Sequence, residues 1–151
     1  MGTSLRRYRV SLFLVCIFVA IRTGYGQTTD YASLTKAGRG EYRAGHFEAA
    51  ETLLRSALKM AQNNGDDVAI ATVQGDLGAV YESEERLIEA ERAYSQALSI
   101  FRRIPDKNYE TAVILRNLAS VYSLTRRYSD ALKVLVEAPK LLKKTLRTNR
   151  S

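Results

Sequence analysis

The strongest constraint on the fold is an internal repeat. Segments 34–61, 74–101 and 115–142 align without a gap, at offsets of 40 and then 41 residues. A unit of this length in three copies is typical of stacked supersecondary elements, each of which needs its neighbours to bury its apolar face. The matching small residues are Ala50, Ala90 and Ala131 at one position and Ala57, Ala97 and Ala138 at another.

Each copy has the pattern of two amphipathic helices. In the middle copy, apolar residues recur every three or four positions on both sides of a short turn, which is the spacing of one helix face. Turn signals separate the helices, including Gly45, the run NNGDD at 63–67 and Pro105. We therefore predict an all-α fold with helices at about 29–44, 47–62, 67–83, 87–103, 108–124 and 128–138.

The repeated pattern resembles the tetratricopeptide repeat, which has Leu-Gly-x-x-Tyr in its first helix and Ala-x-x-x-Phe/Tyr in its second. The middle copy carries Leu77, Gly78 and Tyr81, followed by Ala90 and Tyr94. The last and first copies match less completely, through Leu118, Ala119, Tyr122, Ala131 and Leu135 in the last and Gly38, Tyr42, Gly45, Ala50, Leu54 and Ala57 in the first.

This resemblance implies antiparallel helix-turn-helix units stacked as a right-handed α-solenoid. About three repeats are expected, at about 31–62, 71–103 and 112–142, within a domain at 27–142. The spacing exceeds the usual repeat of about 34 residues and is similar to the long-loop repeats of the kinesin light chain type. The segment LRNLASVY at 115–122 is close to the first-helix pattern of that subfamily.

Residues 1–26 have the organisation of a secretory signal peptide. Arg6, Arg7 and Arg9 precede the apolar run 10–21, and small residues follow it. That run is too short for a hydrocarbon core of about 30 Å, so we expect cleavage rather than a stable membrane span. The mature chain is then exported, periplasmic or secreted in a bacterium, and it loses Cys16 and four arginines. The net charge falls from +7 to +3.

The C-terminal end is basic and contains a helix breaker. Residues 126–151 carry eight basic and two acidic side chains, and residues 143–151 are expected to form a basic tail. Proline in a helix interior costs about 3 kcal/mol, so Pro139 predicts that the last helix stops or kinks near Ala138. Beyond it, residues 140–147 are expected to form a short capping helix, or else the chain is a truncated member of a longer repeat family.

The sequence favours a non-enzymatic protein, with no catalytic, cofactor-binding or metal-ligating residues. His46 is the single histidine and falls in a predicted turn, without a second His or Cys to share a metal ion. The paired acids, among them Asp66, Asp67 and Glu82, fall at loops and helix ends, where solvation and capping explain them. Glycine-rich phosphate loops are absent from the sequence. Four of the nine tyrosines take repeat core positions, which disfavours nucleic-acid stacking.

The resemblance also implies where a ligand binds. In such repeats the first helices of successive units line a groove that holds a peptide. Asn117 is expected to hydrogen-bond an extended backbone and Arg116 to clamp a carboxylate, while Asp76 disfavours acidic ligands. Gly75 and Ala79 predict a shallow middle. The candidate groove residues are Thr35, Arg39, Tyr42, Asp76, Ser83, Arg116, Asn117, Ser120 and Ser123.

The expected function is therefore a protein–protein interaction module with an unidentified protein or peptide partner. Two alternatives stay open. One is a truncated remnant of a longer repeat protein with little independent activity. The other is a protein whose basic tail contacts membrane or nucleic acid, for which binding would depend strongly on salt.

Overall fold

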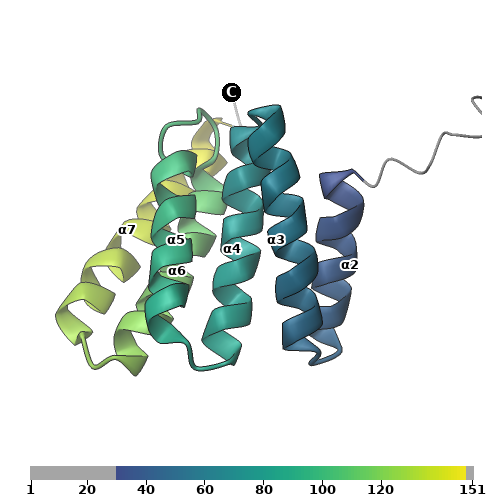
Figure 1. Ribbon diagram of the computed structural model, residues 1–151. Coiled ribbons are helices and arrows are strands. Elements are labelled where there is room, and N and C mark those ends of the chain that lie inside the picture. Colours follow the sequence, from purple (N-terminus) through teal and green to yellow (C-terminus); the bar gives the residue numbers. More distant parts are fainter. Residues whose placement is uncertain (1–29, 149–151) are drawn as a thin grey trace, which may run out of the picture.

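The computed structural model describes residues 30–148, so the predicted signal peptide and the last three residues of the predicted tail lie outside it. The chain forms three antiparallel helix pairs arranged in a row (Figure 1). This arrangement confirms the predicted all-α repeat architecture. The pairs are α2 (Tyr31–Arg43) with α3 (Phe47–Asn64), α4 (Asp67–Ser83) with α5 (Leu87–Phe101), and α6 (Asn108–Leu124) with α7 (Tyr128–Thr148).

The hairpin of each pair turns through one left-handed residue. Gly45, Glu85 and Arg126 have φ angles of 81°, 59° and 60°. The amide of the next residue donates a hydrogen bond to the carbonyl five positions earlier, at 2.7–2.9 Å in the three hairpins, which closes the first helix of each pair. Because these residues are 40 and 41 positions apart, the repeat register predicted from the sequence is confirmed.

Small residues let the two helices of each pair approach closely. A Cβ atom on Gly78 would lie 2.6 Å from the ring of Tyr94, and one on Gly38 would lie 2.8 Å from Leu54 Cγ. Ala90 is also fully buried. Larger side chains at these positions would force the helix axes apart. The core includes Leu54, Val73, Val80, Tyr94, Leu115, Leu118 and Val121.

The arginine that follows the left-handed residue joins the second helix pair to the first and the third helix pair to the second. Arg86 Nη1 donates to Glu51 Oε2 of α3 at 2.7 Å, and Arg127 Nη1 donates to both Glu91 oxygens of α5 at 2.8 Å. Each guanidinium also lies 4.4 Å from the ring centre of a tyrosine, Tyr81 or Tyr122. We call each set of Glu, Arg and Tyr a clasp. It joins neighbouring repeats through the same three positions.

The last helix does not end near Ala138 as predicted. Helix α7 runs to Thr148 with Pro139 inside it, so part of the predicted 143–151 tail is helical and no separate capping helix forms at 140–147. Val134 and Leu141, on either side of the proline, pack against the core. Full burial of such a side chain contributes about 1.5–3 kcal/mol, so partial burial of these two offsets much of the cost of the proline. Arg102 also bonds both Glu137 oxygens at 2.7 Å.

Candidate functional site

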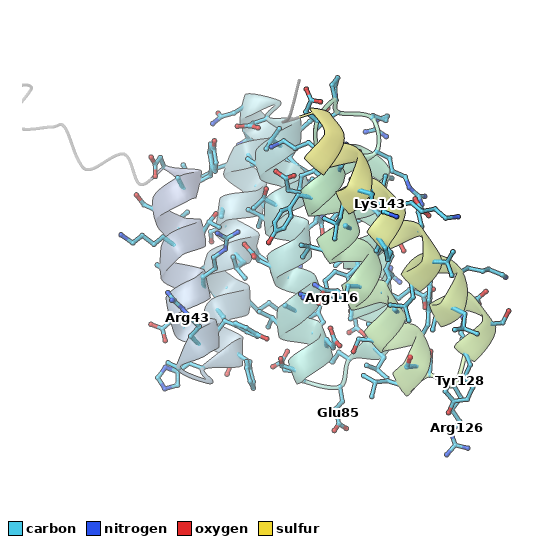
Figure 2. All side chains as sticks on the ribbon, turned by 180° about the vertical axis from the view of Figure 1, so that it is seen from behind. Arg43, Glu85, Arg116, Arg126, Tyr128 and Lys143 are labelled. Carbon is cyan, nitrogen blue, oxygen red and sulfur yellow. The ribbon has the colours of Figure 1, made fainter. Side chains whose placement is uncertain are left out.

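Helices α2, α4 and α6 form one face of the molecule, which we call the groove face (Figure 2). A first hollow of about 740 Å³ lies between α2 and α4. A second hollow of about 220 Å³ lies between α4 and α6. Arg39, Thr72 and Asp76 line both hollows, so the two adjoin along α4.

An ion pair crosses the boundary between the hollows. Arg39 Nε donates to Asp76 Oδ2 at 2.7 Å, which brings together two of the residues predicted from the sequence. Burial raises the pKa of the Asp76 carboxyl above its ordinary value, even though the hydrogen bond and charge of Arg39 lower it. The guanidinium thus compensates the negative charge that Asp76 would present to a ligand.

A polar cluster lies at the C-terminal end of α4, where α4 meets α2 and α6. Glu82 accepts hydrogen bonds from the Tyr94 hydroxyl at 2.9 Å and from Ser120 Oγ at 2.5 Å. The hydroxyl groups of Tyr42 and Ser83 form a hydrogen bond of 3.2 Å. Burial raises the pKa of Tyr94, and the charge of Glu82 raises it further. From the sequence, Glu82 was expected to lie at a solvated helix end, although Glu82 shares a repeat position with the predicted groove residue Tyr42 and with Ser123.

Two predicted groove residues direct their hydroxyl protons into their own helices. Thr35 Oγ1 donates to the Tyr31 carbonyl at 2.6 Å, and Ser123 Oγ donates to the Ala119 carbonyl at 2.8 Å. Thr35 is also buried, with 7% of its surface exposed. These two hydroxyl groups can therefore accept hydrogen bonds from a ligand but are not poised to donate them.

Arg116 and Asn117 lie side by side on α6. Arg116 Nη2 is 3.4 Å from Asn117 Oδ1, and Arg116 is exposed near the middle of the face (Figure 2). Within residues 30–148, Arg116 forms no ion pair. Asn117 lines the second hollow, whereas Arg116 lines a further hollow of about 250 Å³ between α6 and α7.

The first hollow contains cationic side chains that the sequence analysis missed. Lys36 and Arg43 line it beside Arg39, and Lys36 has no ion pair in the described part of the chain. The repeat gave a usable signal, because Lys36 shares the position of Asp76 and Asn117, and Arg43 shares that of Ser83. Asp66 also lines this hollow, but it accepts from Tyr31 Oη at 2.8 Å and from the Ala69 amide at 2.9 Å.

The described residues offer no metal site. His46 Nδ1 lies 2.8 Å from Glu41 Oε2 in an exposed turn. Between residues 30 and 148, no three or more His, Cys, Asp or Glu side chains are grouped to hold a metal ion. The same part of the chain contains no helix long and apolar enough to span a membrane.

The fold defines a helical-repeat protein. The tetratricopeptide repeat model matches residues 68–144, and the chain belongs to the tetratricopeptide repeat family. The weakly conforming first unit lies outside the matched residues. Members of this family generally mediate protein–protein interaction and are typically non-enzymatic.

Among solved structures, the chain is similar to BtubC (BKLC) from P. vanneervenii, with a TM-score of 0.71 and 19% sequence identity. The match covers 76% of this chain and 47% of that one, so this chain spans about half the length of its structural relative. At this identity the likeness establishes the fold alone. No curated protein sequence matches the chain.

Proposed function

We propose that the groove face binds an extended segment of another protein. The observation that carries this proposal is that two hollows adjoin along α4, with Arg39, Thr72 and Asp76 lining both. A site of two adjoining hollows, lined by apolar side chains with charged and amide groups among them, suits a peptide backbone, whose amide and carbonyl groups need partners along their whole length.

The charges favour a ligand segment that contains carboxylates. The two acids of the first hollow are already engaged, Asp66 with Tyr31 and Asp76 with Arg39. Lys36 and Arg116 have no carboxylate partner among residues 30–148. A ligand carboxylate would therefore meet uncompensated positive charge, and guanidinium–carboxylate contacts are among the stronger hydrogen bonds in proteins.

A displayed library of short random peptides, selected on the full chain, tests this function. We expect enriched peptides to be acidic. Their affinity, measured by fluorescence polarisation, should fall at least about tenfold in Arg116→Ala/Asn117→Ala, since each hydrogen bond to a charged group contributes about 1.5–3 kcal/mol.

The matched control is Arg92→Ala/Gln96→Ala on α5, where both side chains are exposed and lie away from the hollows. It removes the same charge and should bind as the parent does. Equal affinity of both double variants for the enriched peptides, or the absence of any enriched peptide, would contradict binding at the groove face.

We also propose that the chain acts after export. The basic start and the apolar run at 10–21 support this, although both lie outside the described residues. Expression of the full chain in a bacterium, followed by fractionation and mass spectrometry, provides the test. We expect a processed chain that begins near Gln27 in the periplasm or medium, whereas a full-length cytoplasmic product would refute export.

A further inference from the structure

The edge formed by α6 and α7 is equivalent to the two edges that receive a helix inside the molecule. Helix α4 packs against α3, and α6 packs against α5 in the same way. Pro139 and Leu142 of α7 share the repeat positions of Leu98 and Phe101, which are only 8% and 4% exposed in α5. In α7 both residues are exposed, and they line the hollow of about 250 Å³ beside α6. We call these residues and this hollow the α6–α7 edge.

The α6–α7 edge differs from the internal edges at the position that receives the next helix. Where α6 packs on α4, Ile114 fills the space that Gly75 leaves, since the Ile114 Cδ1 atom lies 2.9 Å from where a Cβ atom on Gly75 would be. Arg116 holds the repeat position of Gly75 on α6. A helix packed in the same register would therefore place its equivalent of Ile114 against the Arg116 guanidinium.

The charge of Arg116 decides which side chain can meet it. Arg116 lines the hollow and forms no ion pair within residues 30–148. An aliphatic side chain packed on this guanidinium would bury a charge without a partner, which is costly. A carboxylate at the same position would accept hydrogen bonds from it. Lys143, on α7 and on the same side of the molecule (Figure 2), adds positive charge beside the edge.

Position 132 changes a second contact with the incoming helix. Leu132 holds the repeat position of the clasp acids Glu51 and Glu91, and it is 64% exposed. A hairpin arginine on the incoming element would find no acid here to accept its hydrogen bonds. An apolar side chain at that position would instead pack against Leu132.

A second copy of the chain does not match this chemistry. On the outer face of α2, Ser33 and Gly40 share the repeat positions of Ile114 and Val121. The serine offers the Arg116 guanidinium no charge, and the glycine adds no apolar surface. Head-to-tail stacking of α2 on the α6–α7 edge is therefore disfavoured.

We propose that the α6–α7 edge binds an amphipathic helix of another protein, whose apolar face carries one carboxylate that pairs with Arg116. The helix lies along the hollow as α6 lies along α4 and α5, and it covers Pro139 and Leu142. Such helix-in-groove binding depends on apolar side chains at helical spacing. This contact goes beyond peptide binding in the first two hollows and shares only Arg116 with it.

Two locked helices made from the α6 sequence test the proposal, because α6 is the helix that covers the equivalent edge of α4 and α5. Both comprise residues 108–124 and carry a lactam bridge formed through Ala112→Lys and Arg116→Glu. These two positions line the hollow beside α7, so the bridge lies away from the contacting face. The acid probe carries Ile114→Glu. The control probe keeps Ile114 and carries Ser120→Glu, so the two probes have equal charge.

Fluorescence polarisation measures the affinity of each labelled probe for the full chain. We expect the acid probe to bind at least about tenfold more tightly than the control probe, since a hydrogen-bonded ion pair replaces a buried, unpaired charge. Arg116→Glu in the protein should reverse this order. Leu142→Asp should weaken both probes. Ile88→Asp, which adds the same charge at an exposed apolar position of α5, should weaken neither, and circular dichroism should show equal helicity in all variants.

Several results would overturn the proposal. Equal affinity of the two probes, or an unchanged preference in Arg116→Glu, would mean that no carboxylate pairs with Arg116. Undetectable binding of both probes would exclude the α6–α7 edge as a helix site. A parent that sediments as a dimer, with the dimer lost in Leu142→Asp, would assign the edge to a second copy.

The same variants separate this proposal from peptide binding at the groove face. Leu142 lines neither groove-face hollow, so Leu142→Asp should lose the acid probe and still bind the selected extended peptides. Lys36→Ala, in the first hollow, should weaken those peptides and leave the acid probe unaffected. Either proposal can therefore fail while the other holds.

Discussion

The two junctions between repeats hold different side chains at equivalent repeat positions. At the first junction, between α2–α3 and α4–α5, the position of Gly75 holds Thr35 and that of Ile114 holds Val73. At the second junction, the Ile114 methyl lies 2.9 Å from where a Cβ atom on Gly75 would be. A large side chain thus fills the space that glycine leaves. The hollow is about 740 Å³ at the first junction and about 220 Å³ at the second.

The two junctions also differ in the number of hydrogen bonds across the groove face. Three hydrogen bonds join α2 to the α4 region, from Tyr31, Arg39 and Tyr42, while Ser120 to Glu82 joins α6 to α4. The first junction is therefore wider than the second and has more hydrogen bonds across this face.

The largest expected effect on stability comes from removing the buried Ile114 side chain at the second junction. Ile114→Ala should lower the free energy of unfolding by about 3 kcal/mol, since it removes three buried carbons and leaves a cavity. Val73→Ala at the first junction should cost less, about 2 kcal/mol. Urea denaturation measures both. The double variant Gly75→Ala/Ile114→Ala should recover part of the loss, and a larger cost for Val73→Ala would reverse the proposed difference between the junctions.

The clasps provide the next effect. Glu51 accepts hydrogen bonds from Arg86, Arg55 and Tyr81, whereas Glu91 accepts its short hydrogen bonds from one arginine, Arg127. Glu51→Gln should therefore cost about 1–2 kcal/mol, and Glu91→Gln should cost less. Glu85→Gln in an exposed turn serves as the control and should leave the urea midpoint unchanged. Equal losses at both glutamates would mean that the clasps are equivalent.

Acid should weaken the first clasp. Burial of the Glu51 carboxyl opposes its ionisation, but hydrogen bonds from Arg86, Arg55 and Tyr81 outweigh burial and hold its pKa below the ordinary 4.5. Its stabilising contribution is therefore complete above that value and is lost as the pH falls through the lowered pKa. In urea titrations from about pH 6 to about pH 3, the difference between the parent and Glu51→Gln should shrink. A constant difference would contradict the assigned ion pair.

Substitution of Asp76 should have the smallest effect on stability, and that effect should be a gain rather than a loss. Burial raises the pKa of this carboxyl despite Arg39, so its ionised form is disfavoured in the folded chain. Asp76→Asn should slightly raise the urea midpoint at neutral pH, with the gain disappearing as the pH falls below the ordinary value of 3.8. A clear loss of stability would show that the ion pair with Arg39 outweighs burial.

Periodicity predicted most of the fold because local pattern and global architecture agree. The expected and observed bounds of the first five helices differ by at most two residues at each end. The end of α7 was predicted wrongly, because the penalty for Pro139 is local while the packing of Val134 and Leu141 that offsets it is tertiary. Such packing depends on neighbours that no short window of sequence contains.

The repeat register placed the groove residues on their helices but could not pair them. Arg39 and Asp76 are 37 residues apart, and their contact depends on how closely α2 approaches α4. Glu82 was missed for the same reason, since its partners Tyr94 and Ser120 come from two other helices. Whether these residues bind a peptide is a prediction that the binding experiment addresses.

Substitution at two of the left-handed hairpin positions should raise the stability of the molecule. Gly45 adopts its φ angle without strain, but Glu85 and Arg126 pay about 1 kcal/mol each for the same conformation. Both lie at exposed hairpin tips and line neither groove-face hollow (Figure 2). Glycine at these two turns should raise the free energy of unfolding and leave the groove face unchanged. Stability and binding specificity can therefore be engineered separately in this chain.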